Sequence, residues 1–458
     1  MGEKEILQLI DNREFPRVKE VLANMNCADI AEIFAQLDKT NISIIFRLLK
    51  KDEAADVFAY LDPDTQKTLV VSLSDKEIGH IINDLFLDDA VDFIEEMPAV
   101  VVPRILKNAN EETRNQINLF LQYGENSAGS MMTNEFVDLK QNLTVAEAFD
   151  VIRAKAVDKE TIYTCYVKDD TRRLIGIVTV KQLLLAAKGT AVSKLMEKNI
   201  ICVKTTDDRE ILTAMFEKYG LLAIPVVDSE ERLVGIVTID DALTVLKEEA
   251  TEDIEKMAAL KPSERPYLQT SVFRLAANRI VWLLVLMVSA MLTGFIIEGF
   301  ENTIAVLPIL VGFIPLLMDT GGNAGSQSSA LVIRGMAVGE IKTQDVGKVL
   351  WKELRVALLI GVVLAAFIVL RVLIFNGDPS KLVIGTHQNH PIQLGLAVAF
   401  SLVCTVVMAK ILGGLLPIAA KAIKMDPAIM AAPLITTIVD ALSLVVYFGL
   451  LKLLISGL

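Results

Sequence analysis

The chain has 458 residues, of which 53% are apolar and 22% charged, and its formal net charge is −12. Length alone predicts about three domains of roughly 150 residues each. The negative charge argues against a nucleic-acid partner, because phosphate binding needs a basic face, and it fits a surface that handles cations. The four cysteines stand apart without CxxC spacing, which argues against a disulfide framework or a zinc site.

The first quarter of the chain is predicted to be helical. Stretches such as DIAEIFAQLD and DDAVDFIEEMP place apolar residues at i, i+3, i+4 and i+7, and turn residues separate them. The opening MGEKEILQLIDNREF shows no basic segment followed by an apolar run, so we expect no secretory signal. We therefore predict a cytosolic, all-α superhelical N-domain over residues 1–128.

An internal repeat follows the N-domain. LIGIVTVKQLL (174–184) and LVGIVTIDDAL (233–243) align residue for residue, and each is a β-branched run that ends in a helix start. Two such βαββα units resemble a tandem pair of α/β CBS domains, over 129–190 and 191–250. CBS pairs resemble regulatory modules that bind nucleotides or ions rather than enzymes, and no nucleophile–base constellation predicts an enzyme elsewhere in the chain.

The second repeat carries a candidate nucleotide site. Thr238 and Asp241 match the T-x-x-D spacing that often holds the ribose of adenosine, whereas the first copy has Thr179 and Gln182. The resemblance therefore implies at most one typical site, with ATP as the expected ligand. The pattern leaves two alternatives open, one bound nucleotide or none.

A long acidic helix is predicted over residues 241–268, between the CBS pair and the membrane half. Glu248, Glu252 and Glu255 share one of its faces by i+4 and i+3 spacing, as do Glu249 and Asp253. The simplest interpretation is a solvated linker. Its position immediately before the first membrane span favours a coupling role instead.

Residues 270–458 are predicted to form an all-α membrane domain. Five spans are expected, at approximately 280–297, 303–320, 356–375, 394–416 and 428–451. Lys and Arg gather in the second and fourth loops, which places the N-terminus in the cytosol and the C-terminus outside the plasma membrane. Lys410 and Arg371 are expected to lie near the two interfaces, where long side chains can snorkel.

Two polar segments interrupt the apolar pattern of the membrane half. In MDTGGNAGSQSSALVIRG (318–335), small residues allow close helix approach, and Asn323, Gln327 and Ser328 offer uncharged oxygens. The alternative to a functional role for these oxygens is that the motif is a helix end at the cytosolic interface whose small residues serve only helix packing.

The second polar segment is DPAIMAAPLITTIVDALS (426–443). Asp426 is predicted to cap the last helix, and Pro433 to free a carbonyl inside it. Thr436, Thr437 and Asp440 share one broad face with Pro433. An ionised carboxylate in the bilayer core costs roughly 2.5–3.5 kcal/mol, so we interpret Asp440 as part of an ion path rather than as a protonated or hydrogen-bonded packing residue.

The order of these segments, with the motifs GGNAGSQ, DPAIMAAPLITTIVD and EEATEDI, resembles the MgtE family of bacterial magnesium channels and transporters over nearly the whole chain. The resemblance implies a homodimer whose ion path runs between two membrane domains. It also implies that the helix over 241–268 is a plug, which closes the pore when cytosolic magnesium is high.

The resemblance further implies which residues meet magnesium. Asp440 matches the pore acid, Asn323 the inner part of the pore and Asp426 its cytosolic mouth. Regulatory Mg²⁺ is expected to bridge the plug, the CBS pair and the N-domain. Those ligands are Asp241, Glu249, Glu252 and Asp253 on the plug, Asp88, Asp92 and Asp56 in the N-domain, and Asp208 and Glu210 in the second CBS repeat.

We therefore expect a magnesium-selective, channel-like importer that cytosolic magnesium closes. Magnesium keeps several waters in its octahedral shell, so its pore should be wide and lined with oxygens. The alternative is a proton- or sodium-coupled secondary transporter of divalent cations, with Asp440 as coupling carboxylate and CBS domains that read a nucleotide. A membrane-anchored sensor without transport is disfavoured, because an anchor does not need two polar membrane motifs.

Overall fold

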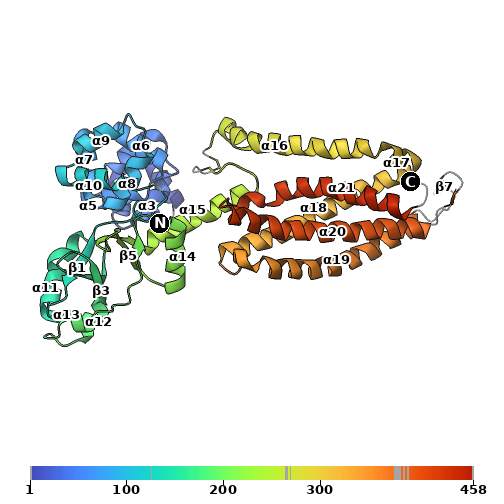
Figure 1. Ribbon diagram of the computed structural model, residues 1–458. Helices are drawn as coiled ribbons and strands as arrows, with labels where there is room; N and C mark the ends of the chain where they lie inside the picture. Colours follow the sequence, from blue (N-terminus) through green and yellow to red (C-terminus); the bar gives the residue numbers. More distant parts are fainter. Residues whose placement is uncertain are drawn as a thin grey trace. The chain divides into compact units, whose positions relative to one another are not determined.

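The computed structural model describes residues 3–124, 126–263, 267–268, 270–375, 383–384, 387–388 and 391–455. The chain forms two units, Met1–Lys247 and Glu248–Leu458 (Figure 1). Each has its own hydrophobic core. The first unit holds the helical N-domain and the CBS pair, and the second holds the long apolar helices.

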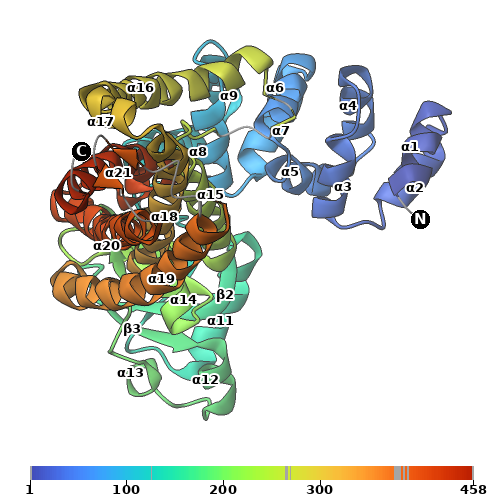
Figure 2. The same ribbon diagram turned by 90° about the vertical axis from the view of Figure 1, so that its right-hand side faces the viewer.

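The N-domain is a curved row of short helices (Figure 2). Asp38, Asp62 and Ser74 are among the N-cap residues whose side chains accept backbone N–H groups and so satisfy donors that the first turn leaves free. The all-α prediction for this region is confirmed. The helices are α1 (Glu3–Asp11), α2 (Phe15–Leu22), α3 (Cys27–Phe34), α4 (Lys39–Phe46), α5 (Lys51–Ala59), α6 (Pro63–Ser72), α7 (Asp75–Asp84), α8 (Leu87–Glu96), α9 (Val102–Asn108) and α10 (Glu111–Phe120).

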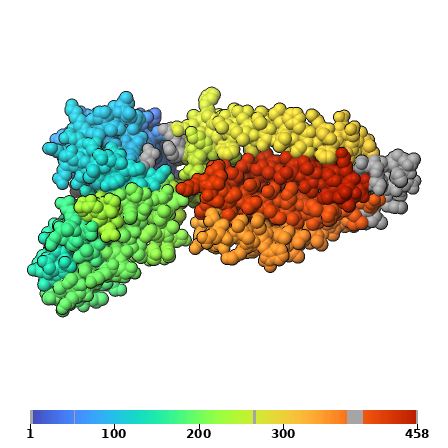
Figure 3. All heavy atoms as spheres, viewed as in Figure 1, coloured from blue at the N-terminus to red at the C-terminus, as the bar shows by residue number. Residues whose placement is uncertain are grey.

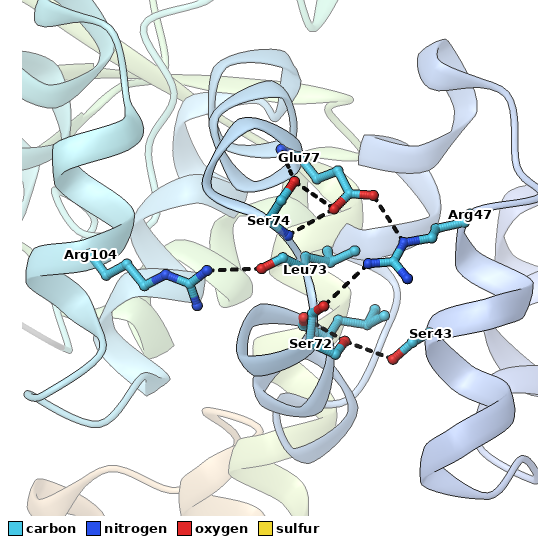
Figure 4. Close-up of polar contacts among 8 residues, drawn as sticks. Ser43, Arg47, Ser72, Leu73, Ser74, Glu77 and Arg104 are labelled. Carbon is cyan, nitrogen blue, oxygen red and sulfur yellow. Dashed lines mark hydrogen bonds and ion pairs between the residues drawn. The ribbon is translucent and has the colours of Figure 1, made fainter.

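Arginine side chains join neighbouring helices of this row (Figure 4). Arg47, the C-cap residue of α4, donates to Glu77 Oε1 at 3.0 Å and to the carbonyl of Ser72 at 3.2 Å. Arg104 of α9 donates to the carbonyl of Leu73 at 2.8 Å. The hydrogen bond from Arg47 lowers the pKa of Glu77 to about 2. The turn between α6 and α7 is thus held from both sides.

The repeat forms two three-stranded sheets, β1-β2-β3 and β4-β5-β6, as the CBS resemblance predicts. In each sheet the first two strands are parallel and the last two antiparallel. Arg172 and Glu231 take left-handed backbone angles at equivalent turns, and each turn accepts a backbone N–H from the other repeat. The elements are β1 (Phe136–Lys140), α11 (Val145–Lys155), β2 (Thr161–Lys168), β3 (Leu174–Thr179), α12 (Val180–Leu185), α13 (Val192–Leu195), β4 (Val203–Lys204), α14 (Arg209–Tyr219), β5 (Ala223–Val227) and β6 (Leu233–Thr238).

The acidic helix α15 (Ile239–Met257) begins directly after β6. It is shorter than the predicted helix over 241–268, because the backbone turns after Met257 and Ala259 takes a left-handed angle. Residues 264–266 of the predicted segment lie outside the described residues. The boundary between the two units falls within α15.

In the second unit α18, α19, α20 and α21 pack together, and α16 runs along α21 (Figures 1 and 3). A two-residue strand pair lies between α19 and α20. The elements are α16 (Val272–Gly299), α17 (Glu301–Val306), η2 (Pro308–Phe313), α18 (Ile314–Ala337), η3 (Thr343–Asp345), α19 (Val346–Phe375), β7 (Val383–Ile384), β8 (His387–Gln388), α20 (Pro391–Ala422), η5 (Pro427–Met430) and α21 (Ala432–Leu454).

Four helical segments of the described chain are long and apolar enough to cross a membrane, namely Val272–Gly299, Thr343–Val372, Gln393–Ala422 and Ala432–Leu454. The expected span over 303–320 is instead broken into α17, η2 and the start of α18. Pro308 and Pro315 explain the break, since proline is tolerated in a first turn but not inside a helix. The GGNAGSQ motif therefore lies within the long helix α18 and not at its end.

Candidate functional site

Glycines of α18 bring its backbone against α21 at the position of Asp440. A Cβ added to Gly322 would lie 2.8 Å from Thr436 Cγ2 and 3.4 Å from Asp440 Oδ1. A Cβ on Gly325 would lie 2.8 Å from Ile435 Cγ2. The sequence predicted that these small residues permit close helix approach, and the structure confirms it.

Asp440 lies half-buried beside this glycine contact. Its Oδ1 atom is buried and has no hydrogen-bond partner within the part of the chain that the structure describes. Asp319 of α18 adds a second negative charge that acts on the Asp440 carboxylate. A buried carboxylate oxygen without a donor is costly, and water or a cation can compensate it. Sequence reasoning did not single out Asp319, although it lies within the quoted segment 318–335, two residues before Gly321.

One face of α18 is polar and exposed. Asp319, Asn323 and Gln327 follow one another at i, i+4 and i+8, so they form a stripe along the helix, and all three are exposed in the single chain. Ser328, which the sequence offered as a further oxygen for an ion, is instead fully buried and donates to Glu353 Oε2 at 2.6 Å. The motif therefore has a packing face and a polar face.

The hydroxyls of the last span bind carbonyls of their own helix. Thr436 Oγ1 donates to Ala432 O at 2.8 Å, and Thr437 Oγ1 donates to Leu434 O at 2.9 Å. Pro433 stands in the first turn of α21, where no intrahelical N–H is needed. The prediction that it frees a carbonyl inside a helix is therefore wrong, since the helix begins only at Ala432.

Asp426 meets a lysine that sequence reasoning missed. Asp426 caps the short η5 helix rather than α21 itself, accepting from Ala428 N at 2.8 Å. Its second oxygen accepts from Lys256 Nζ at 2.8 Å, and the same ammonium lies 2.6 Å from Glu252 Oε1. Burial lowers the pKa of Lys256, but the two carboxylates outweigh burial and raise it above its ordinary value. The ammonium of α15 thus bridges two predicted magnesium ligands.

The remaining predicted acids of α15 lie beside this bridge. Burial raises the pKa of Asp253, and the charges of Asp426 and Glu249 raise it further. Lys256 acts in the opposite direction. The acids of this end of α15 and Asp426 therefore form one electrostatic neighbourhood within the second unit.

A second acidic neighbourhood lies in the first unit, around the start of α8. Asp88 is only 8% exposed, and burial followed by the charge of Asp241 raises its pKa. The pKa of Asp92 is raised to about 7 by burial and then by Asp241. Asp241 itself has a pKa raised to about 7 by burial and by Asp240. The structure thus brings together three of the predicted regulatory ligands.

Two glutamates that the sequence did not single out join this cluster. The pKa of Glu135 and that of Glu160 are each raised to about 7, mainly by burial, and the charges of Asp240 and Asp241 contribute to the raised pKa of Glu160. Each has a buried carboxylate oxygen without a hydrogen-bond partner among the described residues. Both directly precede a strand of the first CBS sheet, and these two strands are parallel. Equivalent positions before two parallel strands lie close together, and this pattern in the sequence could have identified both glutamates.

The cluster extends through Asp89 towards Asp56. Burial and the charge of Asp240 raise the pKa of Asp89 to about 6, and Asp56 adds to this effect. Asp208, another predicted ligand, caps α14 by accepting from Glu210 N at 2.8 Å. The magnesium roles of Asp208 and Glu210 therefore remain predictions.

The carboxylates of this cluster do not form a compact set of metal ligands within the described residues. Among the described residues, no group of three or more His, Cys, Asp or Glu side chains lies close enough to hold a metal ion directly. Lys159 lowers the pKa of Glu135 and so opposes part of the effect of burial there. Magnesium keeps several of its waters and is typically bound through few carboxylates, so a wider ring of acids can hold it.

The candidate nucleotide residues contact each other. Thr238 is 6% exposed, and its Oγ1 donates to Asp241 Oδ2 at 2.9 Å. In the first repeat, Thr179 and Gln182 instead form a reciprocal helix cap. Asp241 is thus shared between the predicted nucleotide site and the acidic cluster.

Two cations of the membrane half contact neighbouring helical segments. Lys410 is only 4% exposed, and its Nζ donates to Ser328 Oγ at 3.1 Å. The guanidinium of Arg371 lies 4.5 Å from the centre of the Phe313 ring, with Nη1 buried. The prediction that Lys410 snorkels is wrong, because neighbouring helices enclose its side chain.

Comparison with known proteins gives consistent matches along the chain. The family model of the MgtE divalent cation transporter matches residues 314–450, that of the MgtE intracellular N domain 25–126, and that of the CBS domain 128–189 and 192–248. The magnesium transporter MgtE of Thermus thermophilus is 34% identical over 371 residues, which cover 81% of this chain and 79% of the relative. That of Bacillus subtilis is 32% identical over 369 residues, covering 81% and 78%.

Two solved structures each resemble just over half of the chain. A crystal structure of the soluble part of a magnesium transporter is 26% identical, with a TM-score of 0.51, and covers 54% of this chain and 98% of its own. A crystal structure of the cytosolic domain of the Mg²⁺ channel MgtE in complex with ATP is 31% identical, with a TM-score of 0.51, and covers 53% and 100%.

Proposed function

Because the chain belongs to the MgtE family of magnesium transporters, we propose that it is a magnesium-selective, channel-like importer that cytosolic magnesium closes. The observation that carries this proposal is the buried Asp440 Oδ1, which has no hydrogen-bond partner among the described residues and lies beside the polar stripe of α18. An intramembrane acid without a basic partner marks an ion or proton path more often than a packing contact.

The ion path is proposed to run between two copies of the chain. Asp319, Asn323 and Gln327 are exposed in one chain, and a helix in lipid does not expose such a stripe to hydrocarbon. A second copy related by two-fold symmetry would cover the stripe and double each acid. The two Asp440 carboxylates would then balance one divalent ion, with water filling the rest of its shell.

Cytosolic magnesium is proposed to close this path through the acidic clusters. Asp88, Asp92 and Asp241 repel one another when all three are ionised, and a cation among them removes that repulsion. Magnesium that binds the closed arrangement more tightly shifts the population towards it. On α15, Glu249, Glu252 and Asp253 would join Asp426 in the same way.

The proposed direction and regulation follow from the sequence. The N-terminus is proposed to face the cytosol and the C-terminus the outside of the plasma membrane, because Lys and Arg gather in the second and fourth loops. ATP is proposed as a ligand of Thr238 and Asp241, supported by the ATP complex of the solved relative. Since Asp241 also belongs to the acidic cluster, nucleotide and magnesium would act on the same carboxylate.

Uptake into proteoliposomes tests the transport mechanism. A channel should admit magnesium under a magnesium gradient and a voltage alone, whereas a coupled transporter needs a proton or sodium gradient. Asp440→Ala should reduce uptake to that of empty vesicles. Uptake that stops when the proton or sodium gradient is removed would overturn the channel proposal in favour of the coupled transporter.

A further inference from the structure

Three polar side chains from three helices meet inside the second unit. Ser328 of α18 donates to Glu353 Oε2 of α19 at 2.6 Å and accepts from Lys410 Nζ of α20 at 3.1 Å. Lys410 Nζ lies 3.8 Å from the same Glu353 oxygen. The side chains of Lys410 and Glu353 are 5% and 12% exposed. The chain thus keeps a fixed charge pair among its apolar helices.

The backbones of α18 and α20 approach each other closely beside the pair. A Cβ added to Gly413 of α20 would collide with the carbonyl of Gly325 on α18. A Cβ on Gly414 would lie 3.4 Å from Glu353 Cγ. Gly325 and Ser328 are three residues apart on α18, as are Lys410 and Gly413 on α20, so glycine contact and charge pair share one interface. The pair therefore fixes how α18 and α20 meet.

The pair also fixes the rotation of α18 about its own axis. Ser328 is turned from Asn323 and Gln327 by roughly 100–140° around the helix. Ser328 lies buried at the pair, and the other two are exposed. A rotation of α18 that moved the stripe would have to break both hydrogen bonds of Ser328.

Stability alone does not account for such a pair. Replacing a buried ion pair by apolar side chains of similar volume is often neutral or stabilising, whereas removing one partner leaves an uncompensated buried charge. An arrangement of charges at this place therefore favours one particular geometry over others that an apolar core would tolerate.

We propose that Lys410 and Glu353 are a positioning pair for transport, which acts through Ser328 to hold Asn323 and Gln327 towards the ion path and so sets ion selectivity. This inference rests on the proposed function. It assigns the pair to orienting the pore helix and not to contact with the ion.

Ion-substituted uptake into proteoliposomes tests the pair. Lys410→Met and Glu353→Gln alone should each lower magnesium uptake by at least about tenfold, since each leaves one buried charge unpaired. The apolar double variant Lys410→Met/Glu353→Met should keep the melting temperature of the wild type but lose the preference for magnesium over sodium by about tenfold or more. Exchanging the two residues should restore that preference. Lys421→Met, on the exposed end of α20, is the matched control and should behave as wild type.

A second measurement detects a rotation of α18 and does not depend on transport activity. In a chain whose four native cysteines are replaced by alanine, Asn323→Cys should react with a water-soluble maleimide. Combining Asn323→Cys with the substitutions Lys410→Met and Glu353→Met should reduce the labelling rate several-fold. Wild-type selectivity and unchanged labelling in the apolar double variant would overturn the positioning role. Absent magnesium uptake by the wild type, together with changed labelling in the double variant, would overturn the proposed function and leave the positioning role supported.

Discussion

Buried acids are compensated in opposite ways in the two units of this chain. In the first unit, burial raises the pKa values of Asp88, Asp92 and Asp241. The negative charge of Asp241 raises those of Asp88 and Asp92 further, and no basic group is among the main causes for these three residues. In the second unit, Glu353 has its own lysine and serine. The difference teaches that the chain supplies a fixed cation where geometry must stay constant. It leaves acids uncompensated where a mobile cation is proposed to come and go.

Asp440 is the sharpest test of this distinction, because it is an uncompensated acid inside the membrane unit. Asp440→Ala should abolish magnesium-dependent growth in a strain that lacks other importers, since the path would lose its negative charge. Asp345→Ala is a matched control, because Asp345 is a partly exposed acid that is paired with Lys348 and lies directly before α19. Normal growth rescue by Asp440→Ala would remove the residue from the ion path.

The sequence predicted the secondary structure and the close helix contact better than it predicted which charged side chains meet. The repeat predicted both CBS sheets, and the glycine motif predicted the close contact of α18 with α21, because local pattern determines both. Lys256 and Lys410 were missed or misplaced, because which acid a lysine meets depends on helix packing. Asp426 was expected to cap the last helix, but the chain inserts η5 before α21 begins.

Neutralising the acids of α15 tests the other side of the comparison. The variant Glu249→Gln/Glu252→Gln/Asp253→Asn should still transport magnesium, but cytosolic magnesium should no longer close the path, because its proposed ligands are gone. Patch recordings at increasing cytosolic magnesium measure this response. The single substitution Glu248→Gln, on the same helix, is the control. Closure of the triple variant at the millimolar magnesium that closes the wild type would contradict the prediction.

The uncompensated cluster of the first unit predicts an unusual pH dependence. Asp92, Asp241 and Glu160 have pKa values near 7 in the folded chain, well above the ordinary carboxylate values that the unfolded chain has. Between the ordinary and the raised values the folded state binds more protons than the unfolded state. The free energy of unfolding should therefore fall as pH rises towards about 7.

Magnesium should reverse this loss, because a cation replaces the protons. Thermal unfolding of the purified chain should begin at a higher temperature at about pH 6 than at about pH 8 without magnesium, and added magnesium should stabilise it more at about pH 8. Asp92→Asn/Asp241→Asn should weaken both dependences. Stability that increases with pH in the absence of magnesium would mean that the cluster already has its counter-ion.

Lys256 is the intermediate case, a fixed cation placed among acids that are proposed to bind a mobile one. It joins Glu252 and Asp426 without any metal, so it should hold α15 against the start of the last span even when magnesium is scarce. Lys256→Met should therefore raise transport at low cytosolic magnesium by a factor of about three, the size expected of a partly exposed ion pair. Closure at saturating magnesium should remain, since the carboxylates are intact. Lys261→Met is the control from the segment that follows α15. Unchanged transport at low magnesium would show that the bridge does not stabilise the closed arrangement. Closure would then depend on magnesium binding to the uncompensated acids alone.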